Sequence, residues 1–388
     1  MAIDKSVIDT VSLEFSSVAR KLAHSGKEML SLGLGEPGFD TPLEIITAAH
    51  DSMLSGENRY ASPWGTPQLL SKIRKKLCSN QAAIGTNELI VTVGAKQALS
   101  LCLTSVLEPY DEVIMIAPCF VSFKPQIKMA EITAVIKEVS LLKDSLNLDF
   151  GAIVQAISEK TKVILINFPN NPTGKLIDKN DMKSLVKIAK KNNIYIISDE
   201  IYSSMVFENC EFESFLNYRK EYKNIFVIDG FSKSFSMTGW RVGYLIGPRP
   251  HIERVAVLQQ HLNTNIPVFI QRGAEAALDL PIGFVEKYNK HLEKNSSFLC
   301  DFVKKSSSLS VVAPGGGMFA FINISKINVN SDSFCTELLK IKSVAATPGI
   351  IFGKDWDDHI RISLGGDANE FEEAVKRIFD FSELKEIT

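Results

Sequence analysis

The chain has 388 residues, of which 45% are hydrophobic and 23% are charged, and its formal net charge at pH 7 is −2. A chain of this length usually exceeds what one hydrophobic core organises, so we expect two lobes. The slightly negative charge argues against a nucleic-acid-binding protein, which would need a basic excess or a basic patch.

The cysteines and the N-terminal sequence bear on the compartment. Six cysteines are scattered without a CxxC pair, which is typical of reduced cysteines, and the histidines show no ligand spacing, so we expect no metal site. The start, MAIDKSVIDTVSLEF, lacks a basic region followed by an apolar core. No apolar run approaches the roughly 18 residues that span a bilayer. We therefore expect a soluble, cytoplasmic protein without a membrane segment.

Short apolar runs alternate with amphipathic segments through the middle of the chain. The runs have the length of buried strands: LIVTV (89–93), VIMIA (113–117), VILINF (163–168), IYIIS (194–198), IFVID (225–229) and YLIG (244–247). Between the third and the fourth run, residues 181–193 place their apolar side chains on one side of a predicted helix. Strands that are apolar throughout and alternate with helices predict a parallel sheet covered on both faces.

The pattern changes after about residue 285. A long polar helix is followed by a glycine-rich turn, PGGGMF (314–319), and by a mixed tail. The turn is not a dinucleotide-binding loop, because no βαβ unit follows it, and we interpret it as the entry to a hairpin. We expect the tail to form a smaller α+β lobe together with about the first 45 residues.

Ligands of parallel sheets gather beyond the carboxyl ends of the strands, so the residues that follow each predicted strand are informative. Gly94 and Ala95 introduce a helix from about Lys96, whose N-terminus either binds a phosphate or is only a strand-to-helix turn. PNNPTGK follows the third strand. The Asn171 amide there either donates a hydrogen bond to a ligand at this edge or belongs to an ordinary turn.

An acid, a phenol and an amine follow the next two strands. Asp199 comes directly after a buried strand, which costs desolvation unless the carboxylate meets a cation; the alternative is a helix N-cap. Tyr202 would share the face of Asp199. Lys233, in GFSKSFS, follows the strand at 225–229, and its alternative is a solvated loop lysine.

Four predicted strands are thus followed by a helix N-terminus, an amide, an acid with a phenol, and an amine. One small molecule, pyridoxal 5′-phosphate, can bind all of these groups. Its aldehyde takes a lysine as a Schiff base, its ring nitrogen takes an acid, its ring oxygen takes donors and its phosphate takes a helix end. We therefore predict that Lys233 holds this cofactor, and that Ser232 and Arg241 reach its phosphate. The amine must be neutral for part of the cycle, so its pKa should fall well below the solution value of about 10.4.

The motifs SDEIY, NNPTG and SKSFSMTGWRVGY resemble those of the fold type I aminotransferases, in particular the aspartate/aromatic group of class I. The resemblance extends from LGLGEPGFDTP (32–42) to HIRISLGG (359–366), which is essentially the whole chain. It implies an α/β fold with a large cofactor-binding domain, residues 46–285, on a mostly parallel seven-stranded sheet between helices. Residues 1–45 and 286–388, from both chain ends, would form a smaller α+β domain.

The resemblance also implies roles for individual residues. Lys233 would be the Schiff-base lysine and proton carrier, Asp199 would pair with the pyridine nitrogen, and Tyr202 and Asn171 would bind the ring oxygen. Phe120 would stack on the ring, and Arg361, aided by the backbone at Gly35, would bind the substrate α-carboxylate. The phosphate set would be Gly94, Ala95, Lys96, Ser232 and Arg241, with Tyr60 reaching the site of a neighbouring subunit in a homodimer with shared active sites.

The substrate is indicated less directly. Relatives often read SPYW where this chain has APCF (117–120), so we expect Cys119, in place of a tyrosine, to alter the polarity of the pocket. In the aspartate- and prephenate-type branch, a lysine after the glycine pair helps to recognise a second carboxylate. Lys96 therefore favours an acidic substrate, or is only a lysine in the first turn of a helix.

The resemblance implies an aminotransferase that moves an amino group from an L-amino acid to a 2-oxo acid in a ping-pong cycle. A lyase on the same fold, such as a carbon–sulfur β-lyase or a cyclopropane-forming synthase, would share Lys233, Asp199 and Arg361. A cofactor-sensing regulator is disfavoured, because only about 31 residues precede the LGLGEP motif, too few for a DNA-binding domain, and because the charge is wrong.

Overall fold

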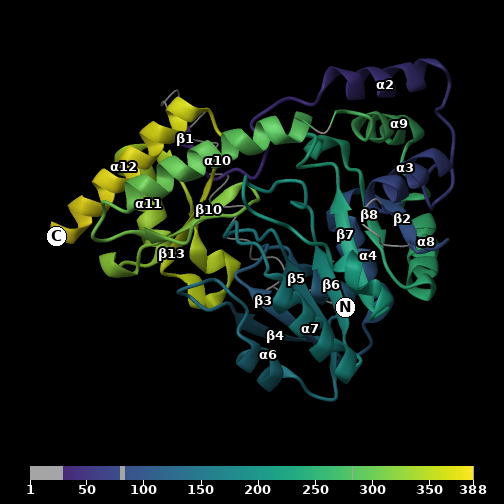
Figure 1. Ribbon diagram of the computed structural model, residues 1–388, viewed down its shortest axis with the longest axis horizontal. Coiled ribbons are helices and arrows are strands. Elements are labelled where there is room, and N and C mark those ends of the chain that lie inside the picture. Colours follow the sequence, from purple (N-terminus) through teal and green to yellow (C-terminus); the bar gives the residue numbers. More distant parts are fainter. Residues whose placement is uncertain (1–28, 79–83, 282, 388) are drawn as a thin grey trace.

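The computed structural model describes residues 29–78, 84–281 and 283–387. Within these residues the chain forms a seven-stranded sheet, a four-stranded sheet and a two-stranded pair (Figure 1). The N-terminal sequence that we searched for a secretion signal, and most of the N-terminal part of the predicted small domain, lie outside the described residues.

The seven-stranded sheet carries all six of the predicted strands and one more. Its spatial order is β2 (Leu89–Thr92), β8 (Gly243–Ile246), β7 (Ile225–Gly230), β6 (Tyr195–Asp199), β5 (Thr161–Asn167), β3 (Glu112–Ala117) and β4 (Val135–Ser140). Every neighbouring pair is parallel except the two that β8 makes, so the sheet is mostly parallel, as predicted. The additional strand, β4, lies at an edge; its sequence VIKEVS is partly exposed and polar in the middle, so it lacked the apolar signal of a buried strand.

Helices cover both faces of this sheet. Consecutive residues of a strand point to opposite sides, and because both sets of side chains are apolar here, each face is buried under helices. In β3, Val113 and Met115 belong to one buried cluster, whereas Ile114 and Ile116 belong to another. The first cluster includes side chains of α4 (Gly94–Val106), α5 (Phe123–Ala130) and α8 (Arg249–Asn263). The second includes side chains of α2 (Leu43–Leu54), α3 (Pro67–Cys78), α6 (Phe150–Ala156), α7 (Lys179–Asn192) and α9 (Val268–Ala277).

The predicted helix at 181–193 is α7, and its ends show why it forms there. Asp178 accepts a hydrogen bond from the backbone N–H of Asn180, and Asn193 ends the helix in the left-handed conformation. The buried side chains of α7 lie on one face, Met182, Leu185, Val186 and Ala189. This apolar stripe packs α7 against the sheet. Because α7 connects β5 to β6, its packing also helps to position these two strands.

The four-stranded sheet is antiparallel and has its own buried cluster. Its strands are β12 (Thr347–Pro348), β13 (His359–Ser363), β10 (Phe319–Asn323) and β9 (Ser310–Val311), while β1 (Leu30–Ser31) pairs in parallel with β11 (Val344–Ala345). Around them lie α10 (Gly283–Val303), α11 (Ser331–Lys342) and α12 (Ala368–Ile387). α11 and α12 lie at the opposite end of the molecule from α2 and α8, whereas α10 reaches toward the middle (Figure 1). The PGGGMF turn lies between β9 and β10, as a hairpin entry should.

Short 3₁₀ turns complete the described secondary structure: η2 (Phe215–Lys220), η3 (Thr238–Trp240), η4 (Ser325–Ile327), η5 (Gly349–Phe352) and η6 (Lys354–Trp356). The division into domains after residues 45 and 285 stays a prediction. The long helix α10 contributes Phe284 to the packing around the large sheet and Leu292 to the cluster around the small sheet. None of the helices in the described part of the chain has both the length and the apolar character needed to cross a membrane.

Candidate active site

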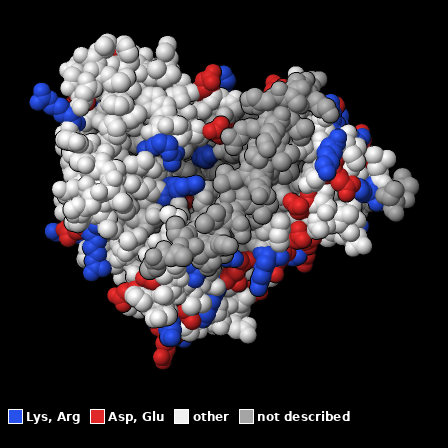
Figure 2. All heavy atoms as spheres, turned by 180° about the vertical axis from the view of Figure 1, so that it is seen from behind, with Lys and Arg blue, Asp and Glu red and all other residues white. Residues whose placement is uncertain are grey.

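A cavity of about 700 Å³ lies where the carboxyl ends of β5, β6 and β7 face the small sheet. Most of the predicted site residues line it, namely Gly35, Ala95, Lys96, Phe120, Asn171, Asp199, Tyr202, Ser232, Lys233, Arg241 and Arg361. Figure 2 shows Lys and Arg side chains gathered near the middle of the face seen from behind, where the surface is hollowed. Elsewhere on that face acidic and basic side chains are mixed, in keeping with a net charge near zero.

Lys233 lies in the segment that follows β7, and its Nζ donates a hydrogen bond to the carbonyl oxygen of Gly35. Burial disfavours the charged ammonium, and the nearby Arg361 guanidinium adds a second positive charge, so the pKa of Lys233 is lowered from 10.5 to about 8. A lysine with this pKa is partly an unprotonated amine near neutral pH. That is the direction that a Schiff-base lysine requires.

Asp199 is the last residue of β6 and is buried at the floor of the cavity. One of its carboxylate oxygens accepts a hydrogen bond of 3.2 Å from the backbone N–H of Ile201. Burial raises the pKa of Asp199 to about 7, because this single hydrogen bond does not offset the loss of water. Asn167, at the end of the neighbouring strand β5, donates to the Asp199 carbonyl at 2.8 Å and accepts from the Asn171 N–H at 2.9 Å.

A second buried carboxylate, Asp229, ties together the two segments that follow β6 and β7. It accepts hydrogen bonds from Ser203 Oγ at 2.8 Å, from Tyr244 Oη at 3.1 Å and from the backbone N–H of Gly230 at 2.6 Å. Its negative charge is one of the causes that raise the pKa of Asp199. We did not single out Asp229, although it is the only polar residue in the predicted strand IFVID and could have been found on that ground.

Arg361, on β13, is held in one orientation from all sides. Its Nη1 donates to Asn171 Oδ1 at 3.1 Å, and its Nη2 donates to the Gly33 carbonyl at 2.8 Å and to Thr347 Oγ1 at 3.3 Å. The guanidinium lies over the rings of Phe319 and Phe352, at 4.1 and 4.9 Å from their centroids.

The Arg361 Nε is buried and has no hydrogen-bond partner among the described residues. Burial lowers the pKa of this guanidinium to about 10, so it remains a cation at neutral pH. A buried cation with an unused N–H group that lines a cavity is suited to bind an anion. Its aromatic and hydroxyl neighbours were not predicted as site residues. Thr347 and Phe352 carry no motif, and Phe319, at the end of PGGGMF, was interpreted only as part of a hairpin entry.

The predicted phosphate residues gather at the N-terminus of α4. Gly94 has φ +71°, and a Cβ there would lie 2.7 Å from Arg241 Nη2, so only glycine leaves room for the guanidinium. The structure begins α4 at Gly94 rather than near Lys96. Burial and the charge of Arg241 lower the pKa of Lys96, and Ser232 lines the same cavity.

Residues 117–120 correct one expectation about the pocket. Phe120 lines the cavity, with Lys96 Nζ 5.4 Å from its ring centroid. Cys119, however, packs in the same buried cluster as α4 and α5 and is not among the residues that line the cavity. Our expectation that Cys119 alters the polarity of the pocket is therefore wrong. The Cys119 thiol is buried, which raises its pKa far above the ordinary value.

Two predicted site residues, Gly94 and Tyr60, are not among those that line the cavity; Gly94 directly precedes Ala95, which does, whereas Tyr60 lies away from it. The Tyr60 side chain is 87% exposed, in the segment between α2 and α3. Tyr202 lies in the cavity, and burial raises the pKa of its phenol, so this group keeps its proton at neutral pH and can donate it in a hydrogen bond.

The residues present fit pyridoxal 5′-phosphate. Asp199 and Arg361 are buried and Lys233 is half-buried in one cavity, and within the described part of the chain none of them makes an ion pair. An uncompensated buried charge is costly, so each of these groups gains free energy when a ligand of matching charge binds. The glycine cradle at Gly94, the unpaired Arg361 Nε and the amine of Lys233 match a phosphate, a carboxylate and an aldehyde, respectively.

Comparison with known proteins gives the same answer. The sequence profile of aminotransferases of class I and II matches residues 27–378. An aspartate aminotransferase of Thermotoga maritima is 36% identical over 374 residues, which cover 95% of this chain and 96% of that protein. Among solved structures, the aspartate aminotransferase of Thermotoga maritima has a TM-score of 0.91 at 33% identity, covering 98% of this chain and 99% of the other. The Thermus thermophilus aspartate aminotransferase with maleate has a TM-score of 0.91 at 28% identity, covering 98% and 100%.

These likenesses extend over nearly the whole chain. They favour an aminotransferase over the lyases that share the fold. Its substrates are an amino acid and a 2-oxo acid. The chain therefore belongs to the class I and II aminotransferase family and is an aminotransferase that depends on pyridoxal 5′-phosphate.

Proposed function

We propose that Lys233 holds the cofactor aldehyde, that Asp199 holds its ring nitrogen, and that Tyr202 and Asn171 hold its ring oxygen. Gly94, Ala95, Lys96, Ser232 and Arg241 bind its phosphate, and Phe120 lies against its ring. The observation that carries this proposal is the set of three titratable groups, the buried Asp199 and Arg361 and the half-buried Lys233, that share one cavity without an ion-pair partner among the described residues.

When bound, pyridoxal 5′-phosphate supplies an electron sink for the negative charge left when the substrate Cα loses a proton. Asp199 favours a protonated ring nitrogen, because a buried carboxylate without a counter-ion is stabilised by a cation beside it. Lys233 then takes and returns the proton at Cα as a general base and acid, a role for which a pKa of about 8 is well placed.

Arg361 positions the α-carboxylate of the substrate. Its guanidinium is already fixed by Asn171, Gly33 and Thr347, so little side-chain entropy remains to be lost when a carboxylate binds. The planar fork of an arginine can hold both carboxylate oxygens, which a lysine could not reproduce. Gly35, whose carbonyl accepts from Lys233, lies beside the same space.

We further propose that the substrate carries a second carboxylate, as aspartate and glutamate do. Lys96 lines the cavity with an exposed side chain and makes no ion pair within the described residues. The relative cited above is named an aspartate aminotransferase, and the Thermus thermophilus neighbour was solved with maleate, a dicarboxylate.

The proposal also includes a homodimer. Tyr60 is exposed and lies away from its own cavity, so it can take part in a cofactor site only if that site belongs to a partner subunit. We keep the cytoplasm as the predicted compartment.

The proposal is tested by incubating the holoprotein with a panel of amino acids and following conversion of the cofactor to its amine form by absorbance. We expect aspartate and glutamate to convert it at lower concentration than alanine or leucine. Lys96→Gln should raise the KM for aspartate about 10-fold or more, through loss of one charge-assisted hydrogen bond, and should leave the KM for a monocarboxylic amino acid almost unchanged.

An equal loss for both substrate classes would assign Lys96 to the cofactor alone. Release of ammonia and pyruvate without a 2-oxo acid acceptor would identify a lyase instead.

A further inference from the structure

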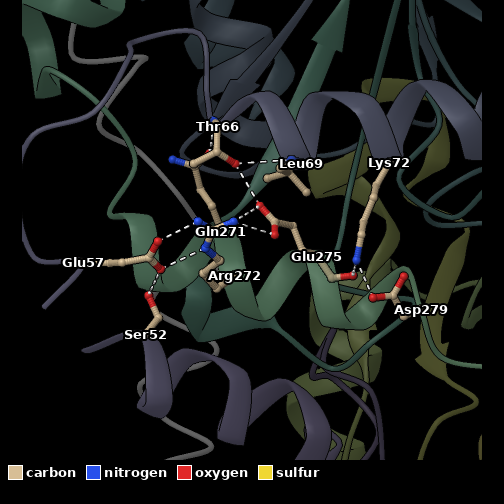
Figure 3. Close-up of polar contacts among 9 residues, drawn as sticks. All are labelled: Ser52, Glu57, Thr66, Leu69, Lys72, Gln271, Arg272, Glu275 and Asp279. Carbon is tan, nitrogen blue, oxygen red and sulfur yellow. Dashed lines mark hydrogen bonds and ion pairs between the residues drawn. The ribbon is translucent and has the colours of Figure 1, made fainter. Parts of the chain in front are cut away.

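Residues 57–66 form most of the connection between α2 and α3 and carry Tyr60 at their most exposed part. Asn58, Arg59 and Tyr60 are all exposed, whereas Gly65 and Thr66 are buried. A segment of this kind would sample many conformations if its ends were free. Both of its ends are instead fastened to α9 by a polar network (Figure 3).

Glu57 fastens the first end. Arg272 donates to it in a two-pronged ion pair, from Nη2 at 2.6 Å and from Nε at 2.9 Å, and Ser52 Oγ donates at 2.7 Å. These hydrogen bonds, that of Arg272 above all, lower the pKa of Glu57 to about 2, so the carboxylate stays charged at any physiological pH. The fork geometry fixes the direction of the chain where it leaves α2.

The same arginine reaches the second end through Glu275. Arg272 Nη1 lies 2.9 Å from Glu275 Oε2, and Glu275 Oε1 accepts from Thr66 Oγ1 at 2.9 Å. Gln271 Oε1, one residue before Arg272, accepts from the Thr66 N–H at 2.6 Å. A Cβ at Gly65, which has φ +108°, would lie 2.5 Å from Val91 Cγ2, so the chain passes close to β2 at this point.

We propose that Glu57, Arg272, Glu275 and Thr66 are positioning residues that preset the Tyr60 segment for the cofactor site of the partner subunit. This inference rests on the homodimer proposed above. With both ends fixed on one rigid helix, only a short exposed stretch remains to be ordered when Tyr60 binds, and preorganisation of this kind strengthens binding. The network of one chain therefore acts on the active site whose Lys233 belongs to the other chain.

The first test is titration of cofactor-free, full-length protein with pyridoxal 5′-phosphate, followed by absorbance of the lysine-bound cofactor. We expect Glu57→Gln and Arg272→Lys each to weaken binding about 3- to 10-fold, because both remove the two-pronged ion pair. The matched control is Asp279→Asn. Asp279, just after the end of α9, pairs with Lys72 of α3 but contacts neither end of the segment (Figure 3).

Comparison with Tyr60→Phe shows whether the effect passes through Tyr60. If it does, adding Glu57→Gln to Tyr60→Phe weakens cofactor binding much less than Glu57→Gln does alone, since coupled residues are not additive. Full additivity would overturn the proposal, and so would unchanged affinity in both network variants.

The decisive test uses mixed dimers isolated with two affinity tags. One chain carries Arg272→Lys, and the other carries Lys233→Ala with an intact network. The single site that retains a lysine then receives its Tyr60 from the intact chain, so its cofactor affinity should return to the wild-type value. In the converse dimer, a wild-type chain pairs with a chain that carries both Arg272→Lys and Lys233→Ala. The only site with a lysine is then that of the wild-type chain, and its cofactor affinity should show the defect.

A defect that follows the lysine-bearing chain in both mixed dimers would overturn the proposal, because the network would then act within its own subunit. Failure of the homodimer itself is recognised separately. Wild-type protein that remains a monomer in size-exclusion chromatography while it catalyses transamination would remove the premise before any variant is made.

Discussion

Asp199 and Arg361 are buried and Lys233 is half-buried, and each of the three lacks an ion-pair partner among the described residues. Asp199, Lys233 and Asn171 could be predicted from the sequence, because each follows a predicted strand and parallel strands bring their carboxyl ends to one edge of the sheet. The aromatic and hydroxyl groups around Arg361 could not be predicted in this way. They come from the small sheet and from turns, whose contacts no local pattern encodes.

Asp199 has a testable effect on the stability of the cofactor-free protein. Its pKa is about 7 in the folded chain and 3.8 in a model peptide, so the folded state holds the extra proton between these values. The free energy of unfolding should therefore fall as the pH rises from about 4 to about 7. Asp199→Asn removes this penalty and should stabilise the cofactor-free protein by roughly 1–3 kcal/mol at pH 8, as measured by urea unfolding.

The same substitution should weaken cofactor binding and slow turnover, because the amide cannot hold a protonated ring nitrogen as a carboxylate does. Near pH 4 the stabilities of the variant and the wild type should converge. A stability difference that does not change with pH would show that the Asp199 carboxylate is compensated within the protein.

At the scale of elements, the site depends on turns that interlock. The Asn-Pro-Thr-Gly turn after β5 ends at Gly174, whose carbonyl accepts hydrogen bonds from the N–H groups of Gly315 and Gly316, at 2.9 and 3.1 Å. Both turns are visible in the sequence, since glycine and proline mark turns by their backbone preferences. Their contact is not, because the two turns are far apart in the chain and belong to different sheets. The edge strand β4 was missed for a similar reason, since its polar middle reflects exposure at the edge.

Gly174→Ala tests this junction. Gly174 has φ +69°, and a Cβ there would lie 2.6 Å from the carbonyl oxygen of Phe319 and 2.6 Å from Pro314 Cβ. Backbone strain and overpacking together should lower the free energy of unfolding by roughly 2–4 kcal/mol, and displacement of Asn171 should raise the substrate KM. Gly366→Ala is the control, since nothing lies within 4 Å of a Cβ at that position. Equal stability of both variants would contradict an interlocked junction.

At the scale of the molecule, the large and small sheets are joined by shared packing around the cavity. Phe321 and Trp356, from the small-sheet region, pack in the cluster of the large sheet, and Tyr202 and Met205 pack in the cluster of the small one. Composition and alternation predicted two lobes and a mostly parallel sheet. Where one lobe ends and the other begins is not encoded in so simple a pattern, because the helix α10 packs on both.

The proposed homodimer can be tested on the exposed face of α2. Leu43 and Leu54 are 72% and 75% exposed, on the helix that leads into the Tyr60 segment. If this face lies in the interface, Leu54→Asp should raise the dimer dissociation constant about 10-fold or more, from the loss of a buried leucine, as measured by sedimentation equilibrium. Cofactor affinity should fall with the dimer fraction. The exposed Leu384, on α12 in the small lobe, provides a control position, and a similar effect of Leu384→Asp would contradict the assignment.

Reduction of the holoprotein with borohydride, followed by peptide mapping, tests the central claim most directly. The reduced cofactor should be found on a single peptide that contains Lys233, and Lys233→Ala should lose both the label and turnover while it retains the fold by circular dichroism. A label on any other lysine, or transamination retained by Lys233→Ala, would contradict the assignment of the active site.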